Sequence, residues 1–237
     1  MAWFRLHQSR FMVASFFSLL TAVCFWQALA TPSETRQILW AWLCLNTNLM
    51  SLAYWLNRPR LILGKTRAGR INPLLLAVNL PWLLFSWVIW WLQQRFSREP
   101  ALSNLGTTGW AVGCYPGRRY PGDQFDVLID LTAEFPRASV RDGNYFAIPN
   151  LDAVALTHPP DEQELHRLNI GPGTRVLVHC AQGHGRSATW CALAFRELGW
   201  FAHAEEAHRF ILEHRPKAQI STSQRAQFNQ KADSPTA

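Results

Sequence analysis

A short stretch in the second half of the chain combines a thiol, two glycines and an arginine. Residues 176–190 read VLVHCAQGHGRSATW, in which an apolar run ends at Cys180 and Arg186 follows six positions later. Gly183 and Gly185 allow the backbone to turn tightly. Backbone N–H groups in such a loop, and at the start of a following helix, can point at one centre and favour an anion there. Because Arg186 carries a planar fork that can hold two phosphate oxygens, the stretch indicates a phosphate site beside a nucleophilic sulfur.

The chemistry expected of this loop is attack by sulfur on phosphorus. The positive field of the loop is expected to favour the thiolate of Cys180, which is the form that attacks. Ser187 can donate a hydrogen bond to the departing thiolate, and His179 can orient the loop. We expect the substrate phosphate to be bound by Ala181, Gln182, Gly183, His184, Gly185 and Arg186.

The segments around the loop predict an α/β fold. Thr174–Cys180 is a candidate buried strand and Ser187–Leu198 a candidate helix; the loop at the carboxyl end of such a strand is a favoured ligand site. Further candidate strands are Trp110–Gly113, Phe125–Leu131 and Tyr145–Pro149, and further candidate helices are Asp161–Leu168, His203–His214 and Ser221–Lys231. Within His203–His214, one helical face carries Ala204, Ala207, His208 and Ile211. This alternation favours a parallel-rich sheet covered by helices.

The order His179-Cys180, five residues, Arg186-Ser187 matches the HC-x5-R-S/T signature, so the chain resembles the cysteine-dependent phosphatases, and in particular their dual-specificity branch. The resemblance covers residues 108–230 and includes the segment Pro216–Gln224, which is similar to the family's closing helices. It implies a dual-specificity-phosphatase-like central sheet flanked by helices, and hydrolysis of phosphate monoesters through a phosphocysteine intermediate without a metal or other cofactor. Leu131-Thr132-Ala133-Glu134 carries a looser resemblance to mitochondrial-type phosphatidylglycerophosphate phosphatases.

The resemblance also implies an aspartic acid, roughly thirty residues before the cysteine, that protonates the leaving oxygen. Asp152 lies 28 residues before Cys180 and just past a predicted strand, so the two side chains are expected at one edge of the sheet. Asp152 would later act as the base for the water that hydrolyses the phosphocysteine. Four other carboxylates have competing explanations: an opposite strand end for Asp142, a helix cap for Asp161, and strand pairing or solvent exposure for Asp126 and Asp130.

Three other interpretations of the loop compete with this one. His179, Cys180 and His184 could ligate zinc with a fourth group, but no paired ligand cluster accompanies them in the sequence. A rhodanese-like sulfur-transfer loop also places a cysteine after a strand, yet an Arg-Ser ending at this spacing fits phosphate better. A phosphatase-like binding module without activity is disfavoured because Cys180, Arg186 and Ser187 are all intact.

Residues 1–100 have the composition of a membrane region. They carry 10 Lys/Arg and 2 Asp/Glu, and nine of the 12 Trp precede residue 92. The apolar segments 11–30, 37–56 and 74–92 are each long enough to cross a hydrocarbon core of roughly 30 Å. Residues 101–231 are expected to form the phosphatase domain, and the tail 232–237 is predicted to be disordered. The excess of basic residues therefore belongs to the membrane region and not to a nucleic-acid-binding face.

The loop Asn57–Asn72 carries five basic residues and no acid, which places it and the N-terminus in the cytoplasm. Three full crossings would put residues 101–237 outside. Pro81 interrupts the third segment, however, and a proline can break a helix and permit a re-entrant or interfacial segment that returns to the cytoplasmic side. Because a reactive thiol functions more easily in a reducing compartment, we expect a cytoplasmic catalytic domain.

We therefore interpret the chain as an integral membrane phosphatase with two partners, the lipid bilayer and a phosphorylated substrate. A lipid phosphate is favoured, because an anchored domain meets headgroups at high effective concentration. A protein tyrosine or dual-specificity phosphatase and a non-catalytic phosphate-binding membrane adaptor are the alternatives. Ala181, Gln182 and His184 stand where phosphoinositide phosphatases of the superfamily tend to carry lysines, which argues against highly phosphorylated inositides.

Overall fold

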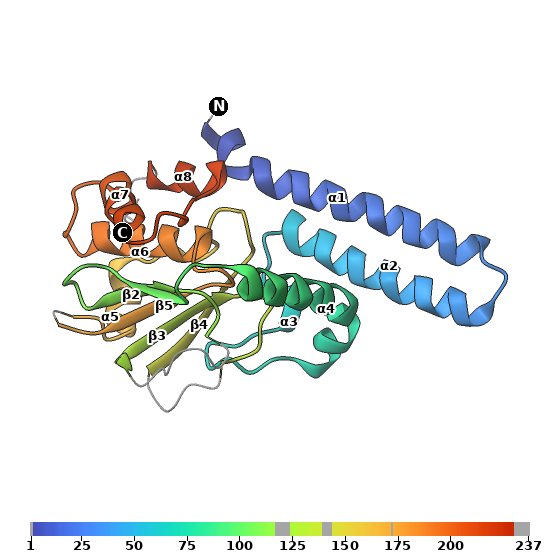
Figure 1. Ribbon diagram of the computed structural model, residues 1–237. Helices are drawn as coiled ribbons and strands as arrows, with labels where there is room; N and C mark the ends of the chain where they lie inside the picture. Colours follow the sequence, from blue (N-terminus) through green and yellow to red (C-terminus); the bar gives the residue numbers. More distant parts are fainter. Residues whose placement is uncertain (1, 117–123, 139–143, 172, 230–237) are drawn as a thin grey trace.

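The computed structural model describes residues 2–116, 124–138, 144–171 and 173–229. A long helical hairpin extends from a sheet that is covered by helices (Figure 1). The hairpin consists of α1 (Ala2–Ala30) and α2 (Glu34–Trp55), and the short helix α3 (Arg60–Leu63) and the longer α4 (Pro73–Phe96) follow it. The predicted tail 232–237 and the alternative acid Asp142 lie outside the described residues.

Helix α4 runs through Pro81 without a break. A proline inside a helix leaves the carbonyl four residues earlier without its donor. Here that carbonyl belongs to Ala77, and the indole Nε1 of Trp42 on α2 donates to it at 3.2 Å and to the carbonyl of Val78 at 3.1 Å. The neighbouring helix thus supplies the missing hydrogen bond, so the proline does not end the helix.

A buried amide pair fastens α4 to the helices beside it. Asn46 of α2 donates to Asn79 Oδ1 at 2.9 Å, and Asn79 Nδ2 donates to the carbonyls of Leu61 and Ile62 in α3. By length and composition, two stretches of the described helices would reach across a bilayer, His7–Ala30 and Pro73–Phe96. The predicted segment 37–56 folds as α2, which is not one of these two.

The sheet has five strands in the order β1-β2-β5-β3-β4. Their bounds are β1 Leu102–Asn104, β2 Trp110–Gly113, β3 Val127–Thr132, β4 Asn144–Asn150 and β5 Val176–His179. Strand β1 is antiparallel to β2, and the remaining pairs are parallel. The predicted α/β class is therefore confirmed. The sequence did not indicate β1, because three residues are too few to show an alternating pattern.

The central strands are buried on both faces. On β5, Val176 and Val178 enter the main core while Leu177 packs on the opposite face. This double burial explains why the strands read as continuous apolar runs. Helices α6 (Gly185–Glu197), α7 (Ala204–His214) and α8 (Thr222–Phe228) lie together on one side of the sheet (Figure 1), and α5 (Glu162–Arg167) precedes β5. The buried residues of α7 are those predicted from periodicity: Ala204, Ala207, His208 and Ile211.

Residues of the N-terminal helices, and of the loop between α3 and α4, pack against the sheet and the loops that follow its strands. A second buried cluster joins residues of α1, α2, α3 and α4 to Ala133, Leu151 and Val154. Lys65, in the loop between α3 and α4, is 1% exposed and lies 2.6 Å from the Asp130 carboxylate of β3. The same loop covers the edge strand β4, where the carbonyl of Arg67 accepts from the amide of Ala147 at 2.8 Å.

Candidate active site

The thiol lies at the carboxyl end of the central strand. Strand β5 ends at His179, Cys180 follows, and helix α6 begins at Gly185. Cys180 is buried, and its Sγ lies 3.4 Å from Ser187 Oγ on the first turn of α6. The side chain of the N-cap residue His184 makes no capping hydrogen bond. The first amides of α6 are therefore not capped by that side chain and can serve an anion.

Gly183 lets the loop lie directly on the end of β2. Its φ is +73°, and a Cβ at this position would lie 2.5–2.8 Å from backbone atoms of Gly113 and Cys114. Both the left-handed conformation and the close approach exclude a larger residue. Gly183 thus shapes the loop from outside the pocket that the other loop residues line.

Arg215, at the end of α7, holds the loop from the protein side. Its Nε donates to the carbonyl of Gly183 at 2.8 Å and its Nη2 to the carbonyl of Gln182 at 3.0 Å. The side chain is 2% exposed, so these bonds form away from solvent. This role could not be predicted from the sequence, because Arg215 stands at the polar end of a helix and next to Pro216.

Arg186 is held in a fixed orientation by Glu134. Its Nη2 donates to Glu134 Oε1 at 2.6 Å, and its Nη1 donates to Glu134 Oε2 at 2.9 Å and to the carbonyl of Asn150 at 3.0 Å. Burial disfavours the charged guanidinium, but the carboxylates of Glu134 and Asp152 outweigh this and raise the pKa of Arg186. In the sequence, Glu134 is notable only as part of the segment Leu131–Glu134, and nothing there predicts that its carboxylate orients Arg186.

The predicted nucleophile, arginine and acid line one pocket. Cys180, Arg186 and Asp152 surround a cavity of about 230 Å³, together with loop residues and with Gln224 of α8. Asp152 Oδ1 lies 3.2 Å from Arg186 Nε, and that Nε has no hydrogen bond within the described residues. The buried Nε2 of Gln224 also has none there. Arg186 Nε therefore faces the Asp152 carboxylate, and Gln224 Nε2 is a buried donor that no described residue uses.

The remaining predicted residues lie beside the cavity or apart from it. His179 is fully buried, with its Nε2 3.9 Å from Asp130 Oδ2. Burial lowers the pKa of His179, although Asp130 acts in the opposite direction. Asp126 bonds the exposed Arg175 at 2.7 Å, and Asp161 caps α5 by accepting from the amide of Glu164 at 2.6 Å. These two aspartates have the structural explanations expected of them.

Within the described ranges, no group of three or more His, Cys, Asp or Glu side chains could hold a metal ion. The alternative of a zinc site therefore has no ligand cluster in this part of the chain. The geometry thus assembles one thiol, one fixed guanidinium and one exposed carboxyl group around a loop whose amides can serve an anion. Such a site can transfer a phosphoryl group to sulfur and then to water.

No family model and no curated protein matches the sequence. Solved structures of dual-specificity and protein tyrosine phosphatases are similar in fold over about half of the chain. A human DUSP28 variant is 16% identical, with coverage of 54% of this chain and 92% of that one and a TM-score of 0.44. PTPMT1 in complex with PI(5)P is 20% identical, with coverage of 53% and 90% and a TM-score of 0.41. The active form of Tk-PTP is 22% identical, with coverage of 53% and 92% and a TM-score of 0.38.

The sheet, its parallel strands and the strand–loop–helix unit therefore define an α/β protein. Identities this low transfer neither a substrate nor a catalytic residue to this chain. The function has to be derived from the chain's own side chains.

Proposed function

We propose that the chain is a membrane-bound cysteine-dependent phosphatase that hydrolyses lipid phosphate monoesters. The observation that carries the proposal is the shared cavity of Cys180, Arg186 and Asp152 at the carboxyl end of β5. Arg186 retains a hydrogen-bond-free Nε after Glu134 has taken both of its Nη groups. Glu134 therefore orients the fork while leaving a donor for phosphate.

Each side chain has one step in the proposed reaction. Cys180 Sγ attacks phosphorus, the ester P–O bond breaks, and the leaving oxygen takes a proton from Asp152. Arg186 and the loop amides hold the oxygens of the phosphoryl group during transfer. Water then attacks the phosphocysteine and gives its proton to Asp152, while the S–P bond breaks. Ser187, 3.4 Å from the sulfur, donates a hydrogen bond to the thiolate as it leaves.

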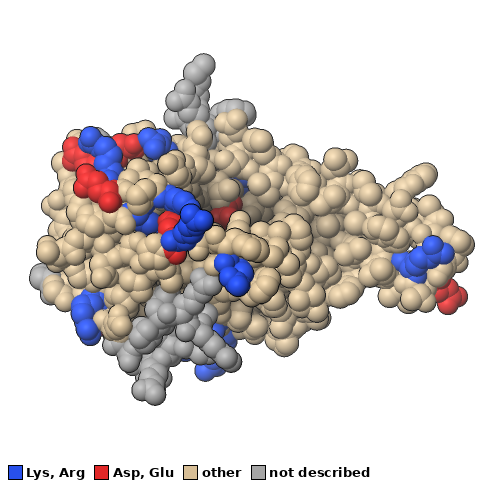
Figure 2. Space-filling view, in the orientation of Figure 1, with Lys and Arg blue, Asp and Glu red and all other residues tan. Residues whose placement is uncertain are grey.

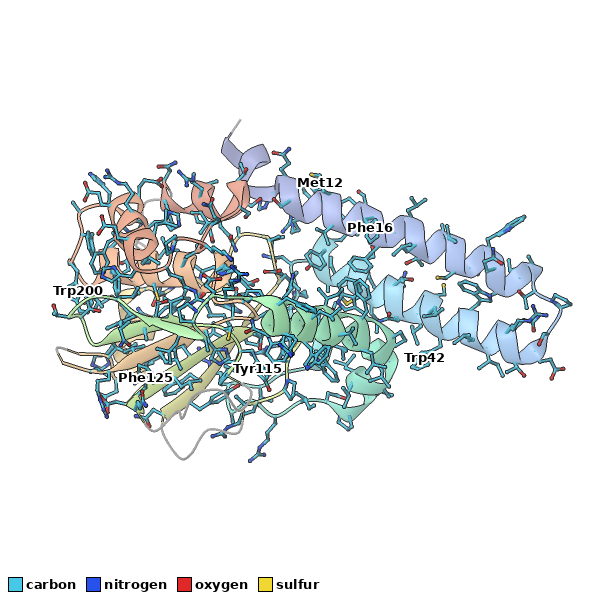
Figure 3. All side chains as sticks on the ribbon, in the orientation of Figure 1. Met12, Phe16, Trp42, Tyr115, Phe125 and Trp200 are labelled. Atoms are coloured by element: carbon cyan, nitrogen blue, oxygen red, sulfur yellow. The ribbon has the colours of Figure 1, made fainter. Side chains whose placement is uncertain are left out.

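The distribution of apolar side chains supports binding to a bilayer. Among the described residues, every large apolar side chain that is clearly exposed lies between residues 12 and 96, with the exception of Trp200. Figure 3 places Met12 and Phe16 on the hairpin and Trp200 at the opposite end of the molecule. On the face drawn in Figure 2, charges occur at the tip of the hairpin and over the part of the molecule that holds the sheet and its covering helices, with a charge-free stretch along the hairpin between them.

The contacts of the helices support a cytoplasmic catalytic domain. The amide of Ser9, near the start of α1, donates to Ser223 Oγ of α8, and Lys65 of the basic loop binds Asp130. If the hairpin crosses the membrane, the N-terminus, the basic loop and the sheet therefore stay on one side. The proposal assigns this side to the cytoplasm by the positive-inside rule. The C-terminal end of helix α4 contacts the active-site loop, and the helix would lie at the interface between membrane and water.

A phosphate-release panel on the full chain in anionic lipid nanodiscs tests the proposal. Phosphatidylglycerophosphate or another lipid monoester should turn over much faster than a phosphotyrosine peptide, and Cys180→Ser should abolish turnover while it keeps ester binding. Full activity in Cys180→Ser would end the phosphocysteine mechanism. A tenfold or greater preference in kcat/KM for the peptide would show that the substrate is a protein.

A further inference from the structure

An apolar groove lies beside the catalytic cavity, between the N-terminal helices and the loop. It has a volume of about 280 Å³, and nine of its lining residues come from α2, α3 and α4: Met50, Tyr54, Ile62, Trp82, Phe85, Ser86, Ile89, Trp90 and Gln93. Among the described residues that line it, none is a lysine, an arginine or a histidine. Two carboxylates line it, and both already lie beside Arg186: Glu134 at 2.6 Å and the more exposed Asp152 at 3.2 Å.

The groove and the catalytic cavity are continuous. Asp152, Ala181 and Gln182 line both of them. A molecule whose phosphate lies against Cys180 can therefore extend the group attached to its ester oxygen toward the groove. The part of the substrate beyond the phosphate has this adjacent space available.

Helix α4 is fixed to the active-site loop, so the wall of the groove is built into the site. Trp90 Nε1 donates to the carbonyl of Ala181 at 2.9 Å, and Gln94 Nε2 donates to Gln182 Oε1 at 2.9 Å. One turn earlier, Trp87 Nε1 donates to the carbonyl of Glu134 at 2.8 Å. These bonds reach both the loop and the residue that orients Arg186.

The outer lip of the groove is apolar and exposed. Phe85 is 56% exposed and Ile89 is 38% exposed, and the exposed Leu84 and Val88 lie next to them on the same helix. The floor is formed by buried side chains such as Met50 and Ile62. A hydrocarbon chain can enter such a space without losing any hydrogen bond, whereas a peptide would bring backbone groups that need partners.

We propose that this groove binds a hydrocarbon chain of the substrate, and that Trp82, Phe85 and Ile89 determine specificity for lipid phosphate monoesters. The inference rests on the proposed phosphatase function and adds to it a binding site for the apolar part of the substrate. It also states which structural element selects that substrate: α4, which belongs to the helical region and not to the sheet.

Chain length is the variable that tests the groove. The full chain in lipid nanodiscs is assayed with butyl phosphate, octyl phosphate and p-nitrophenyl phosphate. Burial of one methylene group corresponds to roughly a fourfold gain in kcat/KM. Octyl phosphate should therefore exceed butyl phosphate by on the order of 10- to 100-fold, because only part of the longer chain is newly buried.

Alkyl phosphates also partition into the bilayer, so a matched pair of variants separates partitioning from the groove. Phe85→Gln changes the lip, and Phe96→Gln makes the same change on the same helix at a residue that is 77% exposed and outside the groove. We expect Phe85→Gln to lower the octyl-to-butyl ratio about tenfold, which corresponds to losing one or two methylene contacts, and Phe96→Gln to keep it. Ser86→Trp, which fills the groove instead of opening it, should lower the ratio as well.

The outcomes distinguish the two proposals. If wild-type protein hydrolyses none of the three esters, the phosphatase function fails and the groove proposal fails with it. If p-nitrophenyl phosphate is hydrolysed, but Phe85→Gln and Ser86→Trp retain the wild-type octyl-to-butyl ratio, the function stands and the groove is not the chain-binding site. Should Phe85→Gln unfold, the ratio in Ser86→Trp decides the question.

Discussion

Removal of Lys65 is expected to destabilise the sheet, although Lys65 belongs to the N-terminal region. Its Nζ lies 2.6 Å from Asp130 Oδ2 and also donates to the hydroxyl of Thr132 at 3.0 Å. Both charged groups are inaccessible to solvent. Replacing Lys65 with methionine keeps the apolar stem but leaves the Asp130 carboxylate buried without its cation.

The expected loss of stability depends on the hydrogen bonds that the Asp130 carboxylate keeps after Lys65 is removed. Breaking a buried pair by removing one partner costs about 3–5 kcal/mol. Asp130 keeps hydrogen bonds from Tyr145 at 2.6 Å and from Thr132, so the lower end, about 3 kcal/mol, is expected for Lys65→Met. For a chain of this size, that loss lowers Tm by about 6–12 °C.

The pH dependence provides a second measure of the same pair. Burial alone would raise the pKa of Asp130, but the charge and hydrogen bonds of Lys65 outweigh burial and lower the pKa to about 2. A folded pKa below the unfolded value of about 3.9 stabilises the protein above that value. This contribution, about 3 kcal/mol, is lost as the pH falls from about 4 through about 2.

The assay is thermal unfolding of the full chain in a mild detergent, followed by near-UV circular dichroism. Arg175→Met is the matched control, because it removes one partner of the exposed Arg175–Asp126 pair and should lower Tm far less than Lys65→Met does. The double variant Lys65→Met/Asp130→Asn should recover part of the lost stability, since no unpaired charge remains and the amide oxygen can still accept from Thr132. Equal Tm values for Lys65→Met and Arg175→Met, or no recovery in the double variant, would refute this reasoning.

Four further outcomes test the site and its placement. Arg186→Lys should be nearly inactive, because an ammonium group cannot replace the bidentate fork; a loss of less than tenfold in kcat/KM would contradict this. Asp152→Asn should slow alkyl phosphate hydrolysis by on the order of 10²–10⁴ and p-nitrophenyl phosphate hydrolysis by less, and equal losses would remove its role as acid. Glu134→Ala should weaken competitive inhibition by inorganic phosphate by roughly tenfold, since two hydrogen bonds to a charged group are lost. Trp200→Cys, in a chain with its other cysteines replaced, should react with an impermeant thiol reagent only after cells are permeabilised, and reaction in intact cells would place the domain outside.

The parts of the site that the sequence predicted are those encoded locally. Strand β5, the turn at Gly183 and the start of α6 follow one another within a few residues, so their pattern was readable without any tertiary information. The cap of α5 by Asp161 is equally local. Asp152 was placed at the same sheet edge as Cys180 because parallel strands bring their carboxyl ends together, and both residues line one cavity.

The parts that the sequence did not predict are long-range polar contacts. Glu134 lies 52 residues from Arg186, and Lys65 lies 65 residues from Asp130. A charged side chain in a polar segment is ordinarily solvated, and only the fold reveals that these are buried and paired. Pro81 is a further example, because the tryptophan that satisfies its freed carbonyl, Trp42, lies 35 residues from Ala77.

The burial of Lys65 also sets an order in which the chain can finish folding. Residues are synthesised from the N-terminus, so Lys65 and helix α4 leave the ribosome before strand β3 exists. Until Asp130 and Thr132 appear, the ammonium group of Lys65 has no buried partner and must remain hydrated. The loop between α3 and α4 therefore reaches its final position only when the sheet forms. The contacts of this loop with β3 are complete only after residues 127–132 have been synthesised.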